Sequence, residues 1–258
     1  MGYLQPDEWQ NIEVTRRGAI TLLRLHTHDG PLVWTARAHQ ELADLWVWLS
    51  GDEATRVAVL MGTGPNFCVE IISPSLEKEW HDIWVEGRRM ISGMVDLNVP
   101  LISIVNGPVS IHTELAVLAD IVLAAPEASF ADRAHMTRGV VPGDGVQVVW
   151  RELLGPTRSS YFLLTGASIE SEEALRLGIV HEVHEREALL DRALEIAAPL
   201  AELSRETLAY ASATLRMQDR RLYGEAVAQG LAYAGLARQF YPNPSPSSIV
   251  AEPAARED

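Results

Sequence analysis

Histidine and carboxylate side chains alternate within one stretch of the chain, residues 106–150. His112 and Glu114 lie two positions apart, and His135 lies nine positions before Asp144, which sits in a Pro-Gly-Asp-Gly turn. A carboxylate held by such a turn can accept a hydrogen bond from an imidazole and fix its tautomer, so that the imidazole can take a proton from water. Alternatively, Asp144 only caps the helix expected after it. We treat these four side chains as a candidate proton-transfer site.

Other groups offer weaker chemistry. The glycine-rich turn at 62–65 follows an apolar strand, but it lacks the third glycine that opens a helix in dinucleotide-binding loops. The N–H of Val69, just after this turn, could serve an oxyanion hole, although an ordinary tight turn explains the glycines as well. Cys68 is the single cysteine, which excludes an internal disulfide and a multi-thiolate metal site. The histidine spacings match no metal motif, so we expect no metal.

Composition narrows the class of protein. A chain of 258 residues with 47% hydrophobic content can bury a sizeable core. A formal net charge of -14 argues against nucleic acid or an anionic membrane surface as a partner. The N-terminus has no basic segment followed by an apolar one, and no apolar run reaches the length of a membrane span. We therefore expect a cytoplasmic globular protein.

Short apolar runs alternate with helical periodicity along the chain. Strands are expected at 12–14, 19–26, 57–61, 101–105, 121–125 and 179–183. Helices are expected at 37–49, 77–94, 113–118, 145–154 and 158–164, then after an N-cap at Ser171, and from 185 almost to 241. This order predicts an α/β core followed by a helical C-terminal region. We divide the chain into a core domain (1–190), a C-terminal helical region (191–240) and an irregular tail (241–258).

Several motifs, in their order along the chain, resemble the crotonase (enoyl-CoA hydratase/isomerase) superfamily. They are Val105-Asn106-Gly107, Glu114-Leu115-Ala116, Ala119-Asp120-Ile121, Gly139 to Gly145 and Leu164-Thr165-Gly166. The resemblance implies a spiral of ββα turns with a C-terminal helical trimerisation region. It also implies an oxyanion hole of two backbone amides, and assembly into homotrimers or dimers of trimers.

The chain departs from the acyl-CoA members of that superfamily at positions that matter for chemistry. Those members carry a run of glycines before the glutamate that matches Glu114, whereas this chain has residues 109–113, which include His112. The second acid of the hydratases corresponds to His135. Lys78 is the single lysine, so the lysines that often hold the nucleotide of coenzyme A have little counterpart. These departures disfavour acyl-CoA hydration while leaving the expected fold unchanged.

A narrower resemblance is to β-diketone hydrolases related to 6-oxocamphor hydrolase. It rests on Leu32-Val33-Trp34-Thr35, Ala38-His39, Phe67-Cys68, Asn106-Gly107-Pro108-Val109, His112, Glu114, His135, Val141-Pro142-Gly143-Asp144-Gly145 and Val149-Trp150. That group cleaves a carbon–carbon bond between two carbonyls by a retro-Claisen reaction, without metal or coenzyme. One departure is Ala234, which aligns near a glutamate of that group's active site.

The resemblance assigns roles to the candidate residues. His135, oriented by Asp144, would activate water, while His112 and the indole of Trp34 would hold the enolate oxygen. Glu114 would position water or be a structural carboxylate. Further contacts to the substrate are expected from His39, Val69 and Trp84.

The expected function is hydrolysis of a cyclic or bicyclic 1,3-diketone to a keto acid, with no cofactor. One alternative is a divergent acyl-CoA enzyme: a hydratase, an isomerase or a thioester hydrolase. Another is a non-catalytic oligomeric binding protein on the same scaffold.

Overall fold

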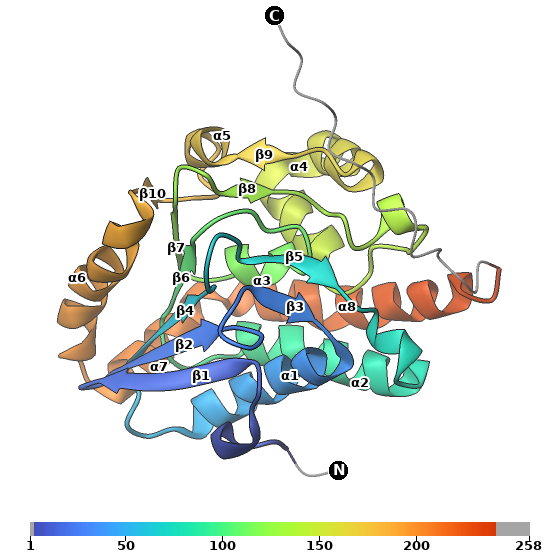
Figure 1. Ribbon diagram of the computed structural model, residues 1–258. Coiled ribbons are helices and arrows are strands. Elements are labelled where there is room, and N and C mark those ends of the chain that lie inside the picture. Colours follow the sequence, from blue (N-terminus) through green and yellow to red (C-terminus); the bar gives the residue numbers. More distant parts are fainter. Residues whose placement is uncertain (1–2, 241–258) are drawn as a thin grey trace, which may run out of the picture.

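The computed structural model describes residues 3–240, so the expected tail at 241–258 lies outside the described residues. A six-stranded sheet with the order β1-β2-β4-β6-β7-β10 forms its centre (Figure 1). The strands are β1 (Ile12–Arg17), β2 (Ile20–Leu25), β4 (Val57–Met61), β6 (Leu101–Val105), β7 (Ile121–Ala124) and β10 (Glu182–Val183). β1 pairs antiparallel with β2, and every other pairing is parallel. Parallel strands are buried on both faces, which explains their continuous apolar runs.

A second, smaller layer of strands lies beside this sheet. In it, β3 (Leu32–Trp34) pairs with β5 (Cys68–Ile71), and β8 (Ser129–Phe130) pairs with β9 (Ile169–Glu170). Bridges from Val109 to Cys68 and to Phe130 join the two pairs. The strand ends of this layer lead into the segments that carry Trp34 and His112.

Helices cover both faces of the main sheet (Figure 1). On one face, α6 (Leu189–Ala201) packs Leu189, Ala193 and Ala197 against the strands. The larger core on the other face is built with α1 (Ala36–Gly51), α2 (Trp80–Val95), α3 (Thr113–Val117), α4 (Val146–Thr165) and α8 (Met217–Ala237). α5 (Ser171–Arg176) and α7 (Arg205–Leu215) complete the described helices. The predicted α/β architecture with C-terminal helices is confirmed.

The C-terminal helices pack against the core of their own chain. α6 begins two residues before the predicted boundary at residue 191 and packs on the sheet. α8 lies along α2, with Leu231 and Ala234 buried. Leu236 on α8 and Leu215 at the end of α7 are exposed. Burial of Leu231 therefore needs no neighbouring subunit. Within residues 3–240, no helix combines the length and apolar character required to cross a membrane.

Local boundaries differ from the sequence-based expectation at two places, and one expected break is found. The break between the helices expected at 145–154 and 158–164 lies within α4 at Gly155, where φ is +73° and Pro156 follows. Glycine tolerates this left-handed conformation, which interrupts the helical hydrogen bonds. Ser171 is not the N-cap of α5: Glu170 holds that position, and the Ser171 hydroxyl donates to the Pro126 carbonyl at 2.7 Å. The strand expected at 179–183 shortens to β10.

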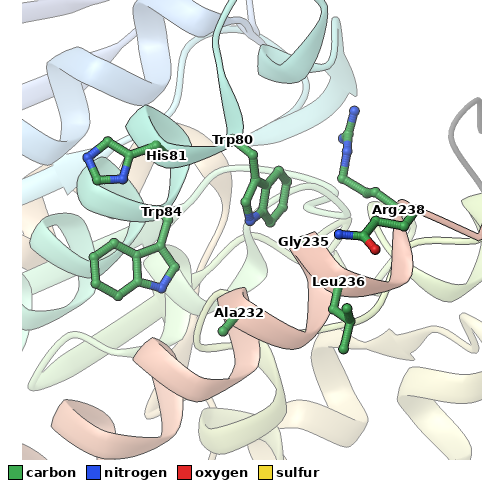
Figure 2. Close-up of a pocket in the computed structure, with 8 residues that line it drawn as sticks. Trp80, His81, Trp84, Ala232, Gly235, Leu236 and Arg238 are labelled. Atoms are coloured by element: carbon green, nitrogen blue, oxygen red, sulfur yellow. The ribbon is translucent and has the colours of Figure 1, made fainter.

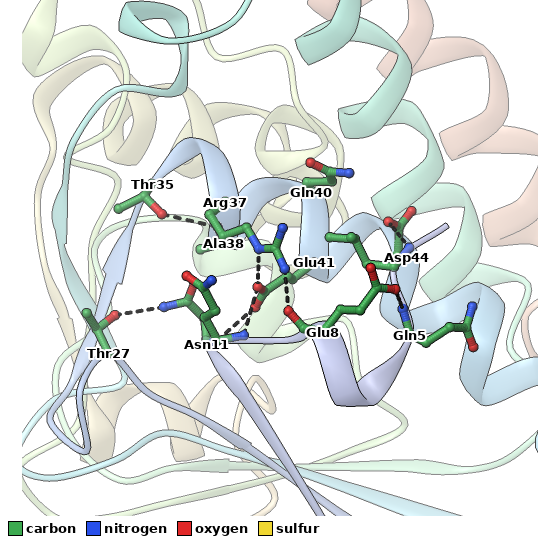
Figure 3. Close-up of polar contacts among 12 residues, drawn as sticks. Gln5, Glu8, Asn11, Thr27, Thr35, Arg37, Ala38, Gln40, Glu41 and Asp44 are labelled. Carbon is green, nitrogen blue, oxygen red and sulfur yellow. Dashed lines mark hydrogen bonds and ion pairs between the residues drawn. The ribbon is translucent and has the colours of Figure 1, made fainter. Parts of the chain in front are cut away.

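The start of α1 is fixed by a buried carboxylate (Figure 3). Glu41 accepts hydrogen bonds from the backbone amides of Gln10 at 2.9 Å and Asn11 at 2.8 Å, and from Nε of Arg37 at 2.6 Å. Thr35 caps the helix by accepting from the Ala38 amide at 3.1 Å. These contacts set the first turn of α1 directly after β3. They therefore fix the positions of Trp34, at the end of β3, and His39, in this first turn.

Candidate active site

Side chains from four connections converge on one buried cluster. Trp34 ends β3, His39 lies in the first turn of α1, and His112 precedes α3. His135 immediately precedes the 3-10 turn η3 (Met136–Arg138), and Asp144 lies two residues before α4. Their exposed fractions range from 1% for Trp34 to 8% for His112 and Asp144. At such burial each polar atom needs a partner, so the hydrogen bonds among these groups define the site.

His135 is held between two carboxylates. Its Nδ1 lies 2.9 Å from Oδ1 of Asp132, and its Nε2 lies 3.1 Å from Oδ2 of Asp144. Burial alone would lower the pKa of His135, but the charges of Asp132 and Asp144 and their hydrogen bonds raise it well above its ordinary value. In return, the charge of His135 holds the pKa of Asp144 below its usual range, although burial opposes this. The three side chains form one proton-holding chain.

Asp132 is a functional candidate that the sequence analysis missed. It lies three residues before His135, is 2% exposed, and its Oδ2 has no hydrogen-bond partner among the described residues. A carboxylate at Nδ1 orients the ring of a histidine and leaves Nε2 to exchange a proton. Sequence analysis gave the orienting role to Asp144, whereas the structure places Asp132 at Nδ1 and Asp144 at Nε2. The Asp-x-x-His spacing was the available signal.

His112 has a strained backbone and contacts the same Asp144 oxygen as His135. Its φ of +49° is left-handed, a conformation uncommon outside glycine. Nδ1 lies 2.6 Å from Oε1 of Glu114 and 3.5 Å from Oδ2 of Asp144. Burial would lower the pKa of His112, but the charge and hydrogen bond of Glu114 raise it. Burial and the nearby Asp144 also raise the pKa of Glu114. A proton shared between His112 and Glu114 is therefore favoured.

The indole of Trp34 lies against His112. The ring centroids are 3.8 Å apart with a 30° interplanar angle, a geometry in which an aromatic face stabilises an imidazolium. Nε1 of Trp34 is buried and has no hydrogen-bond partner among the described residues. Because an indole N–H can only donate, it is an unused donor beside His112. His39 completes this side of the cluster, with its ring 5.9 Å from Trp34 and 6.2 Å from His112.

The backbone before His112 turns back onto β5. The amides of Ser110 and Ile111 both donate to the Cys68 carbonyl, at 2.9 and 3.2 Å. In this loop, which replaces the glycine run, these two amides are therefore engaged within the protein rather than open to a ligand. Val69, the other expected contributor to an oxyanion hole, is half-buried in β5. The contribution expected from the Val69 amide stays a prediction.

Trp84 lies at the interface of α2 and α8. Its Nε1 donates to the Ala228 carbonyl at 3.1 Å. With Trp80, His81, Gly235 and Arg238 it lines a hollow of about 550 Å³ (Figure 2). Its bonding therefore belongs to helix packing rather than to the hydrogen-bonded histidine cluster, and its expected substrate contact stays a prediction.

One set of atoms in the cluster has the composition of a cation site. Nδ1 of His112, a carboxylate oxygen of Glu114 and one of Asp144 lie within 4.8 Å of one another. A histidine and two carboxylates suit a divalent ion such as zinc. The 2.6 Å separation of His112 and Glu114 is, however, the length of a hydrogen bond. An ion would first have to displace the proton between them.

This chain is similar to known proteins in sequence and in structure. Residues 19–231 match the family model described as enoyl-CoA hydratase/isomerase. A carnitinyl-CoA dehydratase of Citrobacter koseri is 31% identical over 196 residues, which cover 74% of each chain. A crystal structure of an enoyl-CoA hydratase/isomerase from Mycobacterium paratuberculosis is 26% identical with a TM-score of 0.80, covering 88% of this chain and 93% of that one.

A β-diketone hydrolase from the cyanobacterium Anabaena is also similar. Its structure, bound to (S)-3-oxocyclohexyl acetic acid, is 35% identical with a TM-score of 0.88, covering 92% of this chain and 97% of that one. Together these similarities confirm the predicted crotonase fold, an α/β protein with a mixed sheet and C-terminal helices. The chain belongs to the enoyl-CoA hydratase/isomerase family.

Proposed function

We propose that this protein hydrolyses a carbon–carbon bond of a cyclic or bicyclic 1,3-diketone by a retro-Claisen reaction. The observation that carries the proposal is the pair of buried histidines, His112 and His135, joined by Asp144 through contacts of 3.5 and 3.1 Å. One histidine can exchange a proton with water while the other holds a developing negative charge. The similarity to the Anabaena β-diketone hydrolase supports this assignment.

His135 activates water in the first step. Asp132 accepts from Nδ1 and keeps a proton there. In the neutral imidazole Nε2 no longer donates to Asp144, so its lone pair can accept a proton from water. The resulting hydroxide adds to one carbonyl carbon and forms a tetrahedral alkoxide. A positioned general base of this kind contributes about 10²–10⁴-fold in rate. The two carboxylates raise the pKa of His135, so the reactive neutral form becomes abundant only at a higher pH than for an ordinary histidine.

His112 and Trp34 serve the second step, in which the carbon–carbon bond breaks. The alkoxide collapses to a carboxylic acid, and the bonding electrons move into the second carbonyl as an enolate. The Trp34 indole N–H and the His112 ring supply donors for that oxygen in a water-poor site. A well-placed donor of this type is worth about 3 kcal/mol. His135 then returns its proton to the enolate carbon, giving a keto acid.

An acyl-CoA reaction is the second candidate, because specific observations favour it. Glu114 is retained at a position that matches a catalytic glutamate of acyl-CoA members, and the carnitinyl-CoA dehydratase is 31% identical. Against it, Glu114 is fully buried and bonded to His112. Lys78 is also engaged by Glu86 at 2.5 Å instead of being free for a nucleotide phosphate. We therefore place diketone hydrolysis first.

A substrate panel tests the proposal. Purified protein is incubated with the bicyclic 1,3-diketone that yields 3-oxocyclohexyl acetic acid when water adds across one carbonyl–carbon bond, and separately with an unsaturated acyl-CoA. We expect keto-acid formation that is abolished by His135→Ala. Turnover of the thioester alone would overturn the proposal in favour of the acyl-CoA reaction. Turnover of neither compound would overturn it in favour of a binding protein.

A further inference from the structure

A second chain of charged groups, Lys78 and Glu86, reaches the site through His39, and the proposed reaction uses neither Lys78 nor Glu86. Nζ of Lys78 lies 2.5 Å from Oε1 of Glu86, and Oε2 of Glu86 lies 2.8 Å from Nδ1 of His39. Lys78 also donates to the Gln40 side chain at 3.3 Å. Glu86 is 7% exposed and His39 is 3% exposed. The ring of His39 then meets Trp34 edge to face.

This geometry fixes the position of the proton on His39. Burial would raise the pKa of Glu86, but the hydrogen bonds from His39 and Lys78 lower it below its usual range, so Glu86 is ionised. An ionised carboxylate only accepts hydrogen bonds, hence Nδ1 of His39 carries a proton. Burial lowers the pKa of His39, and the charges of His112 and Lys78 act in the same direction against the pull of Glu86. His39 is thus a neutral imidazole whose lone pair is on Nε2.

The space beside Nε2 is left open by a glycine. A Cβ on Gly87, the residue after Glu86 in α2, would lie 3.8 Å from Nε2 of His39 and 3.1 Å from Cδ1 of Leu231. The charged or titratable groups that face His39 are Glu86 and Lys78 from the α2 side and His112 from the loop before α3. In the neutral ring Nε2 is therefore an acceptor beside α2, whereas the indole N–H of Trp34 can only donate.

We infer that Lys78 and Glu86 are positioning residues: Glu86 holds the proton of His39 on Nδ1, and Lys78 shares the charge of Glu86 so that His39 stays neutral and no second imidazolium lies beside His112. The inference rests on the proposed function, because it is the enolate that His112 must hold. Two imidazolium rings with centroids 6.2 Å apart in a buried site would each disfavour the charge of the other. Keeping His39 neutral leaves the proton with His112, where the enolate oxygen needs it.

Nitrogen NMR of the full-length protein tests this directly. Two-bond proton–nitrogen spectra of protein labelled with ¹⁵N-histidine report the tautomer and the titration of each ring, with His39 assigned by its loss in His39→Gln. In the wild type we expect the Nδ1–H tautomer for His39 at neutral pH. A wild-type His39 that is Nε2–H or imidazolium at neutral pH would overturn the inference without any variant.

Variants of the ion pair test its cause. Lys78→Met removes the cation that shares the charge of Glu86, so the His39 titration should move to higher pH and that of His112 to lower pH. Lys78→Arg keeps a cation and should restore the wild-type titrations. Glu86→Gln replaces an obligate acceptor with an amide, so a measurable Nε2–H population should appear. Unchanged His39 titration in Lys78→Met, with the fold intact by circular dichroism, would contradict the inference.

Turnover of the diketone separates this inference from the proposed function. We expect Lys78→Met to lose several-fold in kcat at pH 7 and to recover at higher pH as His39 loses its proton, whereas Lys78→Arg follows the wild-type profile. If the NMR shifts appear but wild-type protein cleaves no diketone, the proposed function fails and the assignment of His39 stands. If the diketone is cleaved and Lys78→Met keeps the wild-type pH profile, the positioning role is overturned.

Discussion

His39 and His135 begin from the same arrangement and reach opposite charge states. Each is buried, and each has Nδ1 within 2.8–2.9 Å of one carboxylate oxygen. Nevertheless, the pKa of His39 is lowered and that of His135 is raised. A histidine–carboxylate pair in a core therefore does not determine by itself whether the histidine donates or accepts a proton.

The charged groups next to each histidine–carboxylate pair explain why the two pKa values shift in opposite directions. At His135, a second carboxylate, Asp144, faces Nε2 at 3.1 Å and adds negative charge. At His39, the carboxylate of Glu86 is shared with Lys78, and the other titratable ring nearby is that of His112, with its centroid 6.2 Å away. Burial penalises the cation in both places, so the outcome depends on whether enough negative charge remains to offset it. The same pair of residue types thus supplies a proton carrier on one side and a neutral acceptor on the other.

Matched substitutions of the two histidines should show the difference between their roles most clearly. His135→Gln removes the group that takes the proton from water, so kcat for the diketone should fall by about 10²–10⁴-fold. His39→Gln keeps a polar side chain at a site that transfers no proton, and kcat should fall less than about tenfold. Steady-state kinetics measure both. His184→Gln, which alters a histidine bonded to Glu182, is the control and should match the wild type. Equal losses for the two site variants would contradict the division of roles.

Removing one of the two negative charges around His135 should lower its pKa, so that it behaves more like His39. In wild type, kcat should rise with pH through the raised pKa of His135, because the neutral ring is the base. Asp132→Asn removes the charge at Nδ1, so the midpoint should move to lower pH. The plateau should fall about 10–100-fold, because the ring loses the carboxylate that orients it. A pH–rate profile measures both effects. Asp96→Asn, which changes an exposed carboxylate paired with Arg220, should leave the midpoint in place.

The two histidines should also give stability opposite dependences on pH. His135 has a folded pKa above its unfolded value, so its contribution is fully present below pH 6.5 and is lost as pH rises through the raised pKa. His39 has a lowered folded pKa, so its contribution is present above pH 6.5 and is lost as pH falls through that pKa. Each unit of difference in pKa corresponds to about 1.4 kcal/mol.

Urea unfolding between pH 5.5 and 8.5 measures this contrast. The free-energy gap between wild type and His135→Gln should narrow as pH rises, and the gap between wild type and His39→Gln should widen. Parallel trends would mean that the two rings share one charge state and would contradict the opposite pKa shifts of His39 and His135.

Most of the fold was predictable because its signals are local. Continuous apolar runs marked β4, β6 and β7, because helices cover both faces of the sheet at these strands. The run at 179–180 misled, since the amides of Ile179 and Val180 both donate to the Ala174 carbonyl and close the end of α5 instead of extending β10. Helical periodicity marked α2 but not the orientation of each side chain, such as that of Trp84, whose indole bonds to the Ala228 carbonyl of α8.

The site was predictable where its members are close in sequence. His112 with Glu114, and His135 with Asp144, lie in one stretch and meet in the structure at 2.6 and 3.1 Å. Asp132 escaped because a carboxylate three residues from a histidine indicates contact on a helix but little in a loop. The bond of Glu86 to His39 spans 47 residues and exists because α1 packs on α2. Such a contact has no signature in one sequence.

A single methyl group on α2 should perturb the His39 side while leaving the His135 side unchanged. Gly87→Ala gains about 0.5–1 kcal/mol from helix propensity, but its Cβ would lie 3.1 Å from Cδ1 of Leu231, which must move by a few tenths of an ångström. We therefore expect a net change in stability below about 1 kcal/mol. Since the methyl group narrows the space beside Nε2 of His39, KM for the diketone should rise with kcat unchanged. Gly224→Ala, on α8 with no atom within 4 Å of its Cβ, should show the propensity gain alone. A fall in kcat in Gly87→Ala at constant KM would show instead that the two sides of the site are mechanically coupled.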